Sequence, residues 1–293
     1  MNYKNDAHIY NTIMHDFGGG ELPLLTFDLF KDLEGFRHCF TTRAGGVSEG
    51  VFESLNLSFT RGDDRDKVME NYRRVASYFG KHPEDVVTSD QTHTTTVHKV
   101  GRPASGFGVT RPRAYSDVDG LITNEPGVVL ATFYADCVPL YFIDPVHRAI
   151  GLSHSGWRGT VGRMGKATMQ EMNLHYGTKP EDVFCAIGPS ICKDCYEVSS
   201  DVAEAFTDAF PGHPEILKDL GFPYGHSSNE VLDHKYKLDL WRANEVVLLE
   251  YGVLPEHIAV TNVCTCCNSK ELFSHRASNG KRGNLGAFLM IEE

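Results

Sequence analysis

Three short segments of this chain carry side chains that bind metals. Each follows an apolar, strand-like run: Gln91-Thr92-His93, Ala135-Asp136-Cys137 and His154-Ser155-Gly156-Trp157-Arg158-Gly159. Two imidazoles and one thiolate leave the fourth position of a tetrahedral zinc open, which is typical of catalytic rather than structural sites. We therefore predict that His93, Cys137 and His154 bind one metal ion.

The third segment also predicts an anion site. Arg158 lies between Gly156 and Gly159, just before a helix expected to begin near Thr160. The first turn of a helix has free backbone N–H groups, and a guanidinium offers a planar fork to a phosphate or carboxylate. The alternative interpretation is a loop in which Arg158 forms a salt bridge and Trp157 is a packing anchor.

Other uses of these residue types stay open. Cys137 would also serve as the nucleophile of a Cys–His hydrolase, with His93 or His154 as its base. A closed structural zinc site is a further alternative, because the chain has another group of thiols: Cys192, Cys195, Cys264, Cys266 and Cys267. Residue types and spacing do not decide between these alternatives.

Composition restricts the class of protein. Lys and Arg number 28 against 39 Asp and Glu, which gives a net charge of −11. This balance argues against binding to nucleic acid or to an anionic membrane, because both need basic surface. The chain shows no signal peptide and no apolar run long enough to cross a bilayer. We expect a cytoplasmic protein with small-molecule partners, whose cysteines are thiols or metal ligands.

A repeated pattern predicts the architecture. Three helix-like stretches, Asp66–Tyr78, Val161–Tyr176 and Leu238–Tyr251, are each followed by a glycine, then Pro-Glu, then an apolar strand-like segment. Glycine just past a helix and proline shortly beyond it are the usual stop signals. Between the first two units we expect strands at Gly120–Thr123, Val128–Tyr134, Val138–Ile143 and Ala149–Ser153. The pattern indicates an α/β fold with internal duplication of helix–turn–strand units, in a single domain over residues 1–293.

The repeated units suggest equivalent positions. Thirteen residues after the three glycines lie His93, Ser190 and Thr265. If the units are structurally equivalent, each uses the same strand end, and only the first keeps a metal ligand. The stretch Phe210–His234, which contains several Pro, Gly and His residues, is expected to be an irregular insertion.

Motifs along most of the chain resemble those of one known family. The most distinctive, besides the three metal-ligand segments, are Thr41-Thr42-Arg43-Ala44-Gly45-Gly46-Val47-Ser48, Ile187-Gly188-Pro189-Ser190-Ile191, Cys195-Tyr196-Glu197-Val198 and Phe273-Ser274-His275-Arg276. In this order they resemble the laccase-domain proteins, also called the polyphenol oxidase family and now the purine nucleoside phosphorylase/adenosine deaminase family. The resemblance extends from about Phe36 to the C-terminus.

The resemblance implies a fold, a cofactor and an activity. The implied fold is a four-layer α/β/β/α sandwich with mixed sheets. The implied cofactor is zinc held by His93, Cys137 and His154. The implied activity is phosphorolysis of adenosine, inosine, guanosine and methylthioadenosine, with adenosine deamination at the same site. The tail Gly280-Lys281-Arg282-Gly283-Asn284-Leu285-Gly286 departs from the family's frequent Gly-x-Thr-Gly-Arg form, so no role carries over to Arg282.

Residue chemistry favours the phosphorylase name over the oxidase name. Multicopper laccases assemble their coppers with His-x-His pairs, and this chain has none. Three ligands hold one metal, for which zinc is expected and copper is the less favoured alternative. Phosphate attack on ribose C1′ needs a cationic cradle, for which Arg43 and Arg158 are the candidates. For deamination the metal would acidify a water molecule, and Asp136 is expected to handle protons.

Overall fold

The computed structural model describes residues 1–221 and 234–293. Within these ranges the strands form two six-stranded sheets and one three-stranded sheet. The first large sheet has the order β1-β2-β3-β15-β7-β4, with bounds Tyr10–Asp16, Glu21–Phe27, Phe36–Thr41, Leu285–Ile291, Val129–Tyr134 and Val86–Thr88. The second has the order β14-β10-β8-β9-β6-β5, with bounds Ile258–Val260, Phe184–Ile187, Val138–Asp144, Ala149–Ser155, Gly120–Thr123 and Val97–Lys99. Both sheets are mixed, since β4 is parallel to β7 and β10 is parallel to β14 whereas most other pairs are antiparallel.

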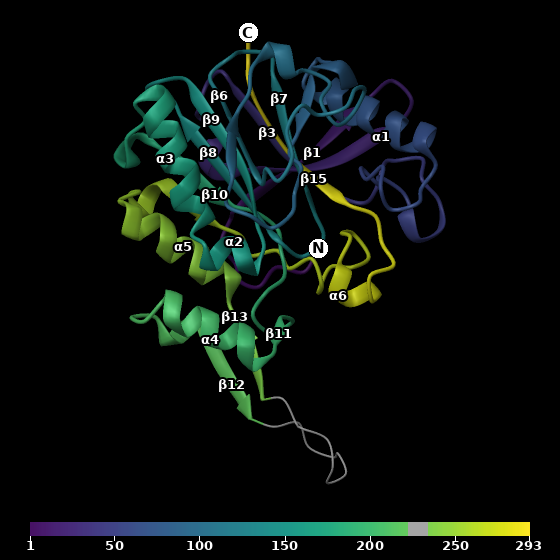
Figure 1. Ribbon diagram of the computed structural model, residues 1–293. Helices are drawn as coiled ribbons and strands as arrows, with labels where there is room; N and C mark the ends of the chain where they lie inside the picture. The colour runs from purple at the N-terminus through teal and green to yellow at the C-terminus, as the bar shows by residue number, and fades with distance from the viewer. Residues whose placement is uncertain (222–233) are drawn as a thin grey trace.

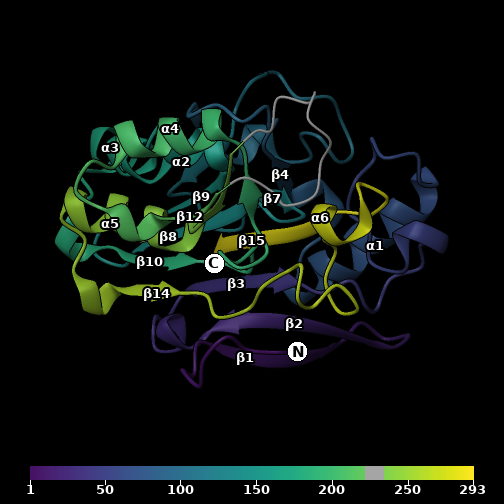
Figure 2. The ribbon, with the colours of Figure 1, turned by 90° about the horizontal axis from the view of Figure 1, so that it is seen from below.

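Helices pack on both large sheets (Figures 1 and 2). Helix α1 (Arg65–Tyr78) packs on the first sheet, and α3 (Met164–Tyr176) and α5 (Leu240–Tyr251) pack on the second. The shorter helices are α2 (Trp157–Val161), α4 (Ser200–Ala209) and α6 (His275–Ser278). Together with α4, the small sheet projects below the large sheets in Figure 1; its order is β11-β13-β12, with bounds Glu197–Val198, Lys235–Leu238 and Leu217–Gly221.

Three hydrophobic clusters lie where the faces of these elements meet. Along β8, Tyr141 and Ile143 belong to the cluster between the two large sheets, whereas Leu140 and Phe142 belong to the cluster under α3 and α5. The third cluster joins α1 to the other face of the first sheet. Because both faces of β8 are covered, its sequence is almost continuously apolar. The α/β class with mixed sheets is confirmed; the four-layer order stays a prediction, which these clusters support.

The three helix–turn–strand units are present. Helices α1, α3 and α5 are followed by glycines with positive φ, Gly80 at 65°, Gly177 at 76° and Gly252 at 106°. Residues with a side chain rarely adopt this left-handed backbone conformation, so glycine is the residue that allows the chain to leave the helix. Short 3-10 helices beginning at the repeated proline then lead into β4, β10 and β14: Pro83–Asp85, Pro180–Asp182 and Pro255–His257.

Several boundaries differ from the sequence prediction by one or more residues, and two of these lie close to His154. The continuous helix expected over Val161–Tyr176 is wrong at its start, because Arg163 has a φ of 61° and interrupts the helix before α3 begins at Met164. Strand β9 is two residues longer than expected, because its end continues to pair with β8. His154 is therefore held on a strand rather than in a loop.

The expected equivalence of three positions holds for two of them. Ser190 and Thr265 follow the adjacent parallel strands β10 and β14, and the Thr265 N–H donates to the Ser190 carbonyl at 3.1 Å. His93 follows β4, which lies in the other large sheet. The stretch Phe210–His234 is not wholly irregular, because it contains β12, and its residues 222–233 lie outside the described part of the chain.

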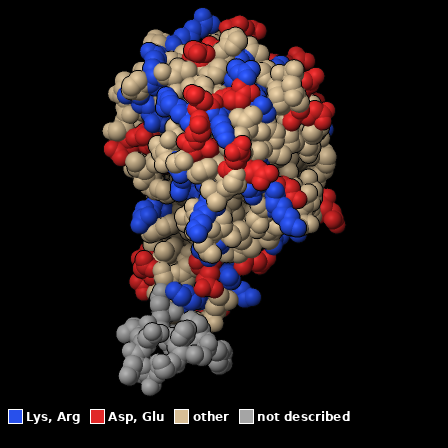
Figure 3. Space-filling model, turned by 90° about the vertical axis from the view of Figure 1, so that its right-hand side faces the viewer, with Lys and Arg blue, Asp and Glu red and all other residues tan. Residues whose placement is uncertain are grey.

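Charged side chains of both signs are interspersed on the surface. On the face seen in Figure 3, Lys and Arg do not gather into an extended basic area of the kind that nucleic-acid binding requires. The described residues include no helix that is long and apolar enough to span a membrane.

Candidate active site

The three expected metal ligands line one cavity. Its volume is about 320 Å³, and His93, Cys137 and His154 all contribute to its wall. The rest of the wall comes from the chain before α1, from α1 itself, from the end of β7 and from the segments after β4, before β6 and before β15. A concave site of this size is suited to a small organic molecule.

The ligand atoms of the triad converge although the residues lie far apart in the sequence. The ring nitrogens of His93 and His154 and the Cys137 Sγ lie within 4.8 Å of one another. The two imidazole centroids are 5.0 Å apart and the rings are nearly perpendicular, at 82°. His93 has a φ of 69°, and Asp136, just before Cys137, has a φ of 92°. Positive φ is uncommon for side chains of this size, and such strain is concentrated at functional sites.

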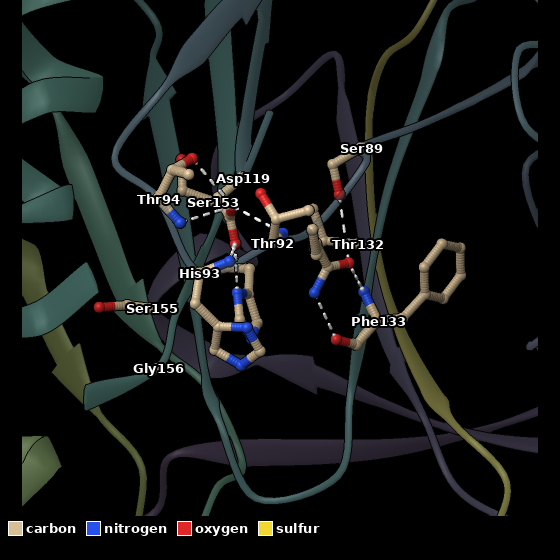
Figure 4. Close-up of polar contacts among 12 residues, drawn as sticks. Ser89, Thr92, His93, Thr94, Asp119, Thr132, Phe133, Ser153, Ser155 and Gly156 are labelled. Atoms are coloured by element: carbon tan, nitrogen blue, oxygen red, sulfur yellow. Dashed lines mark hydrogen bonds and ion pairs between the residues drawn. The ribbon is translucent and has the colours of Figure 1, made fainter. Parts of the chain in front are cut away.

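Asp119, which sequence reasoning missed, positions two of the three ligands (Figure 4). Its buried carboxylate accepts hydrogen bonds from the backbone N–H groups of Thr92, His93 and Thr94, at 3.0, 3.1 and 2.9 Å. It also accepts a bond from His154 Nδ1 at 2.7 Å. This bond leaves Nε2 free, and a carboxylate behind a histidine is characteristic of metal-binding imidazoles. In the sequence Asp119 is one of 39 acidic residues, and only the structure shows that it is buried beside the ligands.

The thiol and imidazole groups of the triad shift each other's pKa. Burial would raise the pKa of Cys137, but His154 and His93 outweigh this effect and lower the pKa to about 6. Burial would lower the pKa of His154, but Cys137 and Asp119 raise it to about 9. In the metal-free protein each of the two groups therefore favours the charged form of the other. The thiolate is both the nucleophilic and the metal-binding form of cysteine.

The triad fits a single metal ion. Two imidazole nitrogens and one thiolate sulfur suit zinc and leave one coordination position for another ligand. Copper also accepts such ligands. In the described part of the chain, the other group of potential ligands is a set of four cysteines. Neither group is the multi-histidine arrangement that several coppers require.

The two arginines expected to hold phosphate do not line this cavity. The guanidinium of Arg43 donates to the carbonyls of Glu53 and Ser269 at 2.7 and 3.0 Å, in a neighbouring cavity. Arg158 is exposed on α2, and its guanidinium carbon lies 4.4 Å from the ring centroid of Trp157. Their roles in binding phosphate stay predictions.

Three other arginines, Arg61, Arg113 and Arg282, line the triad cavity. Arg282 is only 9% exposed and its Nε has no hydrogen-bond partner. Burial and then the neighbouring Arg61 lower its pKa to about 10. By contrast Arg113, on the same wall, forms an ion pair with Asp90 at 3.3 Å. A buried guanidinium with a free donor next to a second guanidinium is a favourable place for an anion.

The carboxylate of Asp136 is engaged behind the cavity rather than in its lining. It accepts hydrogen bonds from Thr265 Oγ1 at 2.6 Å and from the Arg276 N–H at 2.7 Å. Its carbonyl accepts a bond from the Ile191 N–H at 3.0 Å. These bonds tie the turn that carries Cys137 to the loops after β10 and β14. The expected proton-handling role stays a prediction, and the contacts are those of a positioning residue.

Fold and cavity together are those of an α/β enzyme whose cavity contains a group of side chains that could hold a metal ion. Residues 37–292 match the family model described as multi-copper polyphenol oxidoreductase laccase. The chain belongs to this family, which confirms the resemblance of its motifs.

Relatives of known name cover most of this chain. The purine nucleoside phosphorylase YlmD of Bacillus subtilis (strain 168) is 36% identical over 255 residues, which cover 87% of this chain and 88% of that protein. The adenosine deaminase RL5, from an unknown prokaryotic organism, is 32% identical over 256 residues, which cover 87% of this chain and 94% of that protein. The crystal structure of YlmD from Geobacillus stearothermophilus matches with a TM-score of 0.82 at 35% identity, over 97% of this chain and 100% of that one.

Proposed function

We propose that this protein is a single-domain, zinc-dependent purine nucleoside phosphorylase that also deaminates adenosine. The observation that carries the proposal is one cavity that holds both the metal-ligand triad and the unpaired Nε of buried Arg282. The printed activities of YlmD and RL5 support the two reactions. We infer phosphate and the nucleosides adenosine, inosine, guanosine and methylthioadenosine as its substrates.

Arg282 and Arg61 are the proposed phosphate cradle. In phosphorolysis a phosphate oxygen forms a bond to ribose C1′ while the glycosidic C–N bond breaks and its electrons leave with the purine. Cations that packing holds in place stabilise this transfer without reorganising. Arg282 also lines the neighbouring cavity that contains Arg43 and Lys281, so these cations extend the same positive region.

An aromatic wall offers a place for the purine. Phe59, Tyr72 and Phe133 line the triad cavity. The rings of Phe59 and Tyr72 stack with centroids 5.3 Å apart and an interplanar angle of 2°. Tyr72 is buried and stacks on Phe59, so the half-buried rings of Phe59 and Phe133 are the aromatic surfaces that a heterocycle would contact.

His93, Cys137 and His154 would hold the zinc ion. Such an ion supplies Lewis-acid chemistry beside a bound nucleoside and acidifies water for deamination. The chain contributes the orientation of these ligands, since Asp119 holds the His154 ring and the backbone of His93. Asp136 contributes by fixing the turn that carries Cys137.

Two other functions use the same residues and make different predictions. A metal-free Cys–His amide hydrolase is favoured by the lowered pKa of Cys137 beside His154. Its activity would persist after metals are removed with a chelator and would be lost after alkylation of the Cys137 thiol. A copper-dependent phenol oxidase of the laccase type would consume oxygen and lose activity when copper is replaced by zinc.

Product analysis of adenosine incubated with the zinc-loaded protein tests the proposal. With phosphate we expect adenine and ribose 1-phosphate, and without phosphate we expect inosine alone. The absence of both base release and inosine would contradict the proposal and favour the hydrolase. Oxygen uptake with a phenolic substrate, measured on the same preparation, distinguishes the oxidase.

A further inference from the structure

Four cysteines outside the active site converge from two loops. Cys192 and Cys195 follow β10, and Cys264 and Cys267 follow β14. These strands are adjacent and parallel, so their carboxyl ends meet at one edge of the sheet. All four Sγ atoms lie within 4.8 Å of one another. Each pair has the Cys-x-x-Cys spacing that is common in structural zinc sites.

The sulfur separations match a shared ion better than covalent pairs. With Zn–S bonds of about 2.3 Å, the sulfur atoms of a tetrahedral site lie about 3.8 Å apart. The Sγ atoms of Cys195 and Cys267 are 3.5 Å apart, well beyond the bond length of a disulfide. All eight cysteines of the chain are free thiols.

The surroundings stabilise thiolates. The backbone N–H groups of Cys192 and Cys267 point at the Cys264 sulfur, at 3.2 and 3.4 Å. Hydrogen bonds from backbone amides favour the charged form of an acceptor. Four thiolates around a divalent ion carry an excess of negative charge. Lys4 is close enough to interact electrostatically with Cys192 and Cys267, and it also pairs with Asp194 at 3.1 Å.

Packing as small hydrophobes does not explain the whole group, although Cys195 also packs against the core that holds Cys192 and Cys264. Cys192 and Cys264 are 3% and 0% exposed and belong to the core under α5. Cys195 is half-buried and Cys267 is exposed. An exposed thiol gains nothing from hydrophobic packing, so burial does not account for the convergence of all four sulfurs.

We propose that Cys192, Cys195, Cys264 and Cys267 bind a second zinc ion, which is structural and distinct from the metal of the triad. The complete set of four thiolates leaves no position for a substrate. The ion joins two loops that otherwise meet through few hydrogen bonds. The loop after β14 also holds the N-terminal segment, since the Lys4 N–H donates to the Asn262 carbonyl at 2.8 Å.

This second ion would brace the active site from behind. Both loops that it joins also bind Asp136, through Ile191 and Thr265. Asp136 precedes the triad ligand Cys137 directly. Loss of the second ion is therefore expected to lower thermal stability first and to affect activity through the position of this turn.

Zinc content per chain tests the proposal. Protein purified under reducing conditions with zinc is expected to contain two ions in the wild type, one in His93→Ala, and one in a Cys195→Ser/Cys267→Ser variant. Cys266→Ser is the matched control, because this residue lies between two of the proposed ligands without joining their group, and it is expected to keep both ions.

A cobalt spectrum keeps the test independent of the folding of the cysteine variants. His93→Ala loaded with Co²⁺ is expected to show the intense sulfur-to-metal charge transfer and the visible bands of a tetrahedral thiolate site. Adding Cys266→Ser to this variant is expected to leave these bands unchanged. A wild-type protein with a single zinc that His93→Ala abolishes would overturn the proposal. Mass spectrometry that finds these four cysteines paired as disulfides in the protein as purified for the zinc measurement would overturn it as well.

Discussion

At the scale of single residues, Asp119 holds two of the three proposed metal ligands in place. This carboxylate binds His154 Nδ1 at 2.7 Å and three consecutive backbone N–H groups around His93. Asp119→Asn is expected to weaken zinc binding by about 10-fold to 100-fold, the usual cost of losing a partner of a metal-binding histidine. Competition with a chromophoric chelator measures this change.

The neighbouring Asp117 provides the matched control for this prediction. It is exposed and binds the Thr92 hydroxyl at 2.9 Å without contacting a ligand ring. Asp117→Asn is expected to bind zinc like the wild type. Equal losses in the two variants would show that Asp119 has no special relation to the metal.

The charge of Arg282 is predicted to matter for phosphate in particular. Removal of a charged hydrogen-bond donor costs about 1.5 to 3 kcal/mol, so Arg282→Gln is expected to lower kcat/KM for phosphate by about 10-fold to 100-fold. Adenosine deamination, which uses no phosphate, is expected to stay close to that of the wild type. Steady-state rates of both reactions on one preparation give the comparison.

Arg43→Ala distinguishes the two cavities. The Arg43 guanidinium of the wild type is bound to carbonyls outside the triad cavity. We therefore expect Arg43→Ala to lose less activity than Arg282→Gln, and to lose more phosphorolysis than deamination. Equal losses in both reactions would deny Arg43 a phosphate-specific role. A larger loss than that of Arg282→Gln would place phosphate in the neighbouring cavity.

His38 predicts how stability depends on pH. Its buried Nε2 accepts a hydrogen bond from the Phe27 N–H at 2.8 Å, and burial lowers its pKa to about 3. The unfolded chain, with a histidine pKa of about 6.5, binds a proton that the folded protein does not. Stability is therefore lost as pH falls below about 6.5, by about 2 kcal/mol at pH 5.

Urea unfolding at pH 7 and pH 5 measures this contribution. His38→Gln keeps a hydrogen-bond acceptor but does not titrate, so its stability is expected to fall by about 2 kcal/mol less than that of the wild type over this interval. His98→Gln, at an exposed position, is expected to behave like the wild type. An identical pH dependence in His38→Gln and the wild type would contradict the prediction.

The sequence predicted which three side chains converge as candidate metal ligands, but not the groups around them. His93, Cys137 and His154 have distinctive chemistry and lie at strand ends, so their types and positions pointed to them; their binding of a metal stays a prediction. Asp119 and Arg282 become visible only in three dimensions, since 35 residues separate Asp119 from His154. A carboxylate or guanidinium is common on any surface, and only burial and its contacts show that it has a role.

At the scale of elements, the turn from β9 into α2 lies directly against two of the proposed metal ligands, His93 and Cys137. A Cβ on Gly156 would lie 2.9 Å from the His93 ring and 3.2 Å from the Cys137 Sγ. The φ of Gly156 is −74°, so alanine is compatible with the backbone and the expected defect is local. Gly156→Ala is expected to fold with near-normal stability and to bind zinc about 5-fold to 150-fold more weakly, which corresponds to a tight contact of about 1 to 3 kcal/mol.

Gly159 in the same helix is the control. A Cβ there would have no neighbour closer than 3.6 Å. Gly159→Ala is expected to retain the wild-type affinity for zinc in the same chelator competition. Unchanged zinc binding in Gly156→Ala would mean that the ligands move apart when the ion binds.

Elements with local signals were predicted well and those with distant causes were not. Glycine and proline mark the ends of α1, α3 and α5, and their effects act within a few residues. The extension of β9 to Ser155 depends on pairing with β8, which leaves no pattern in the local sequence. The break at Arg163 has a local signal, because Gly162 directly before it caps α2.

At the scale of the whole molecule, the two large sheets bring ligands from both sides to one cavity. Cys137 lies in the turn that leads from β7 of the first sheet to β8 of the second, and His154 lies on β9 of the second sheet. His93 lies on the connection from β4 to β5, which also passes from the first sheet to the second. We therefore place the metal site of the triad between the two large sheets and assign both proposed reactions to it.

Zinc titration of the metal-free protein tests this assignment most directly, with adenine and inosine formation from adenosine recorded in the same samples. We expect the rates of adenine and inosine formation to rise in parallel as zinc is added, and neither rate to rise in His93→Ala. Phosphate-dependent adenine release at full rate in the metal-free protein, or in His93→Ala, would contradict it.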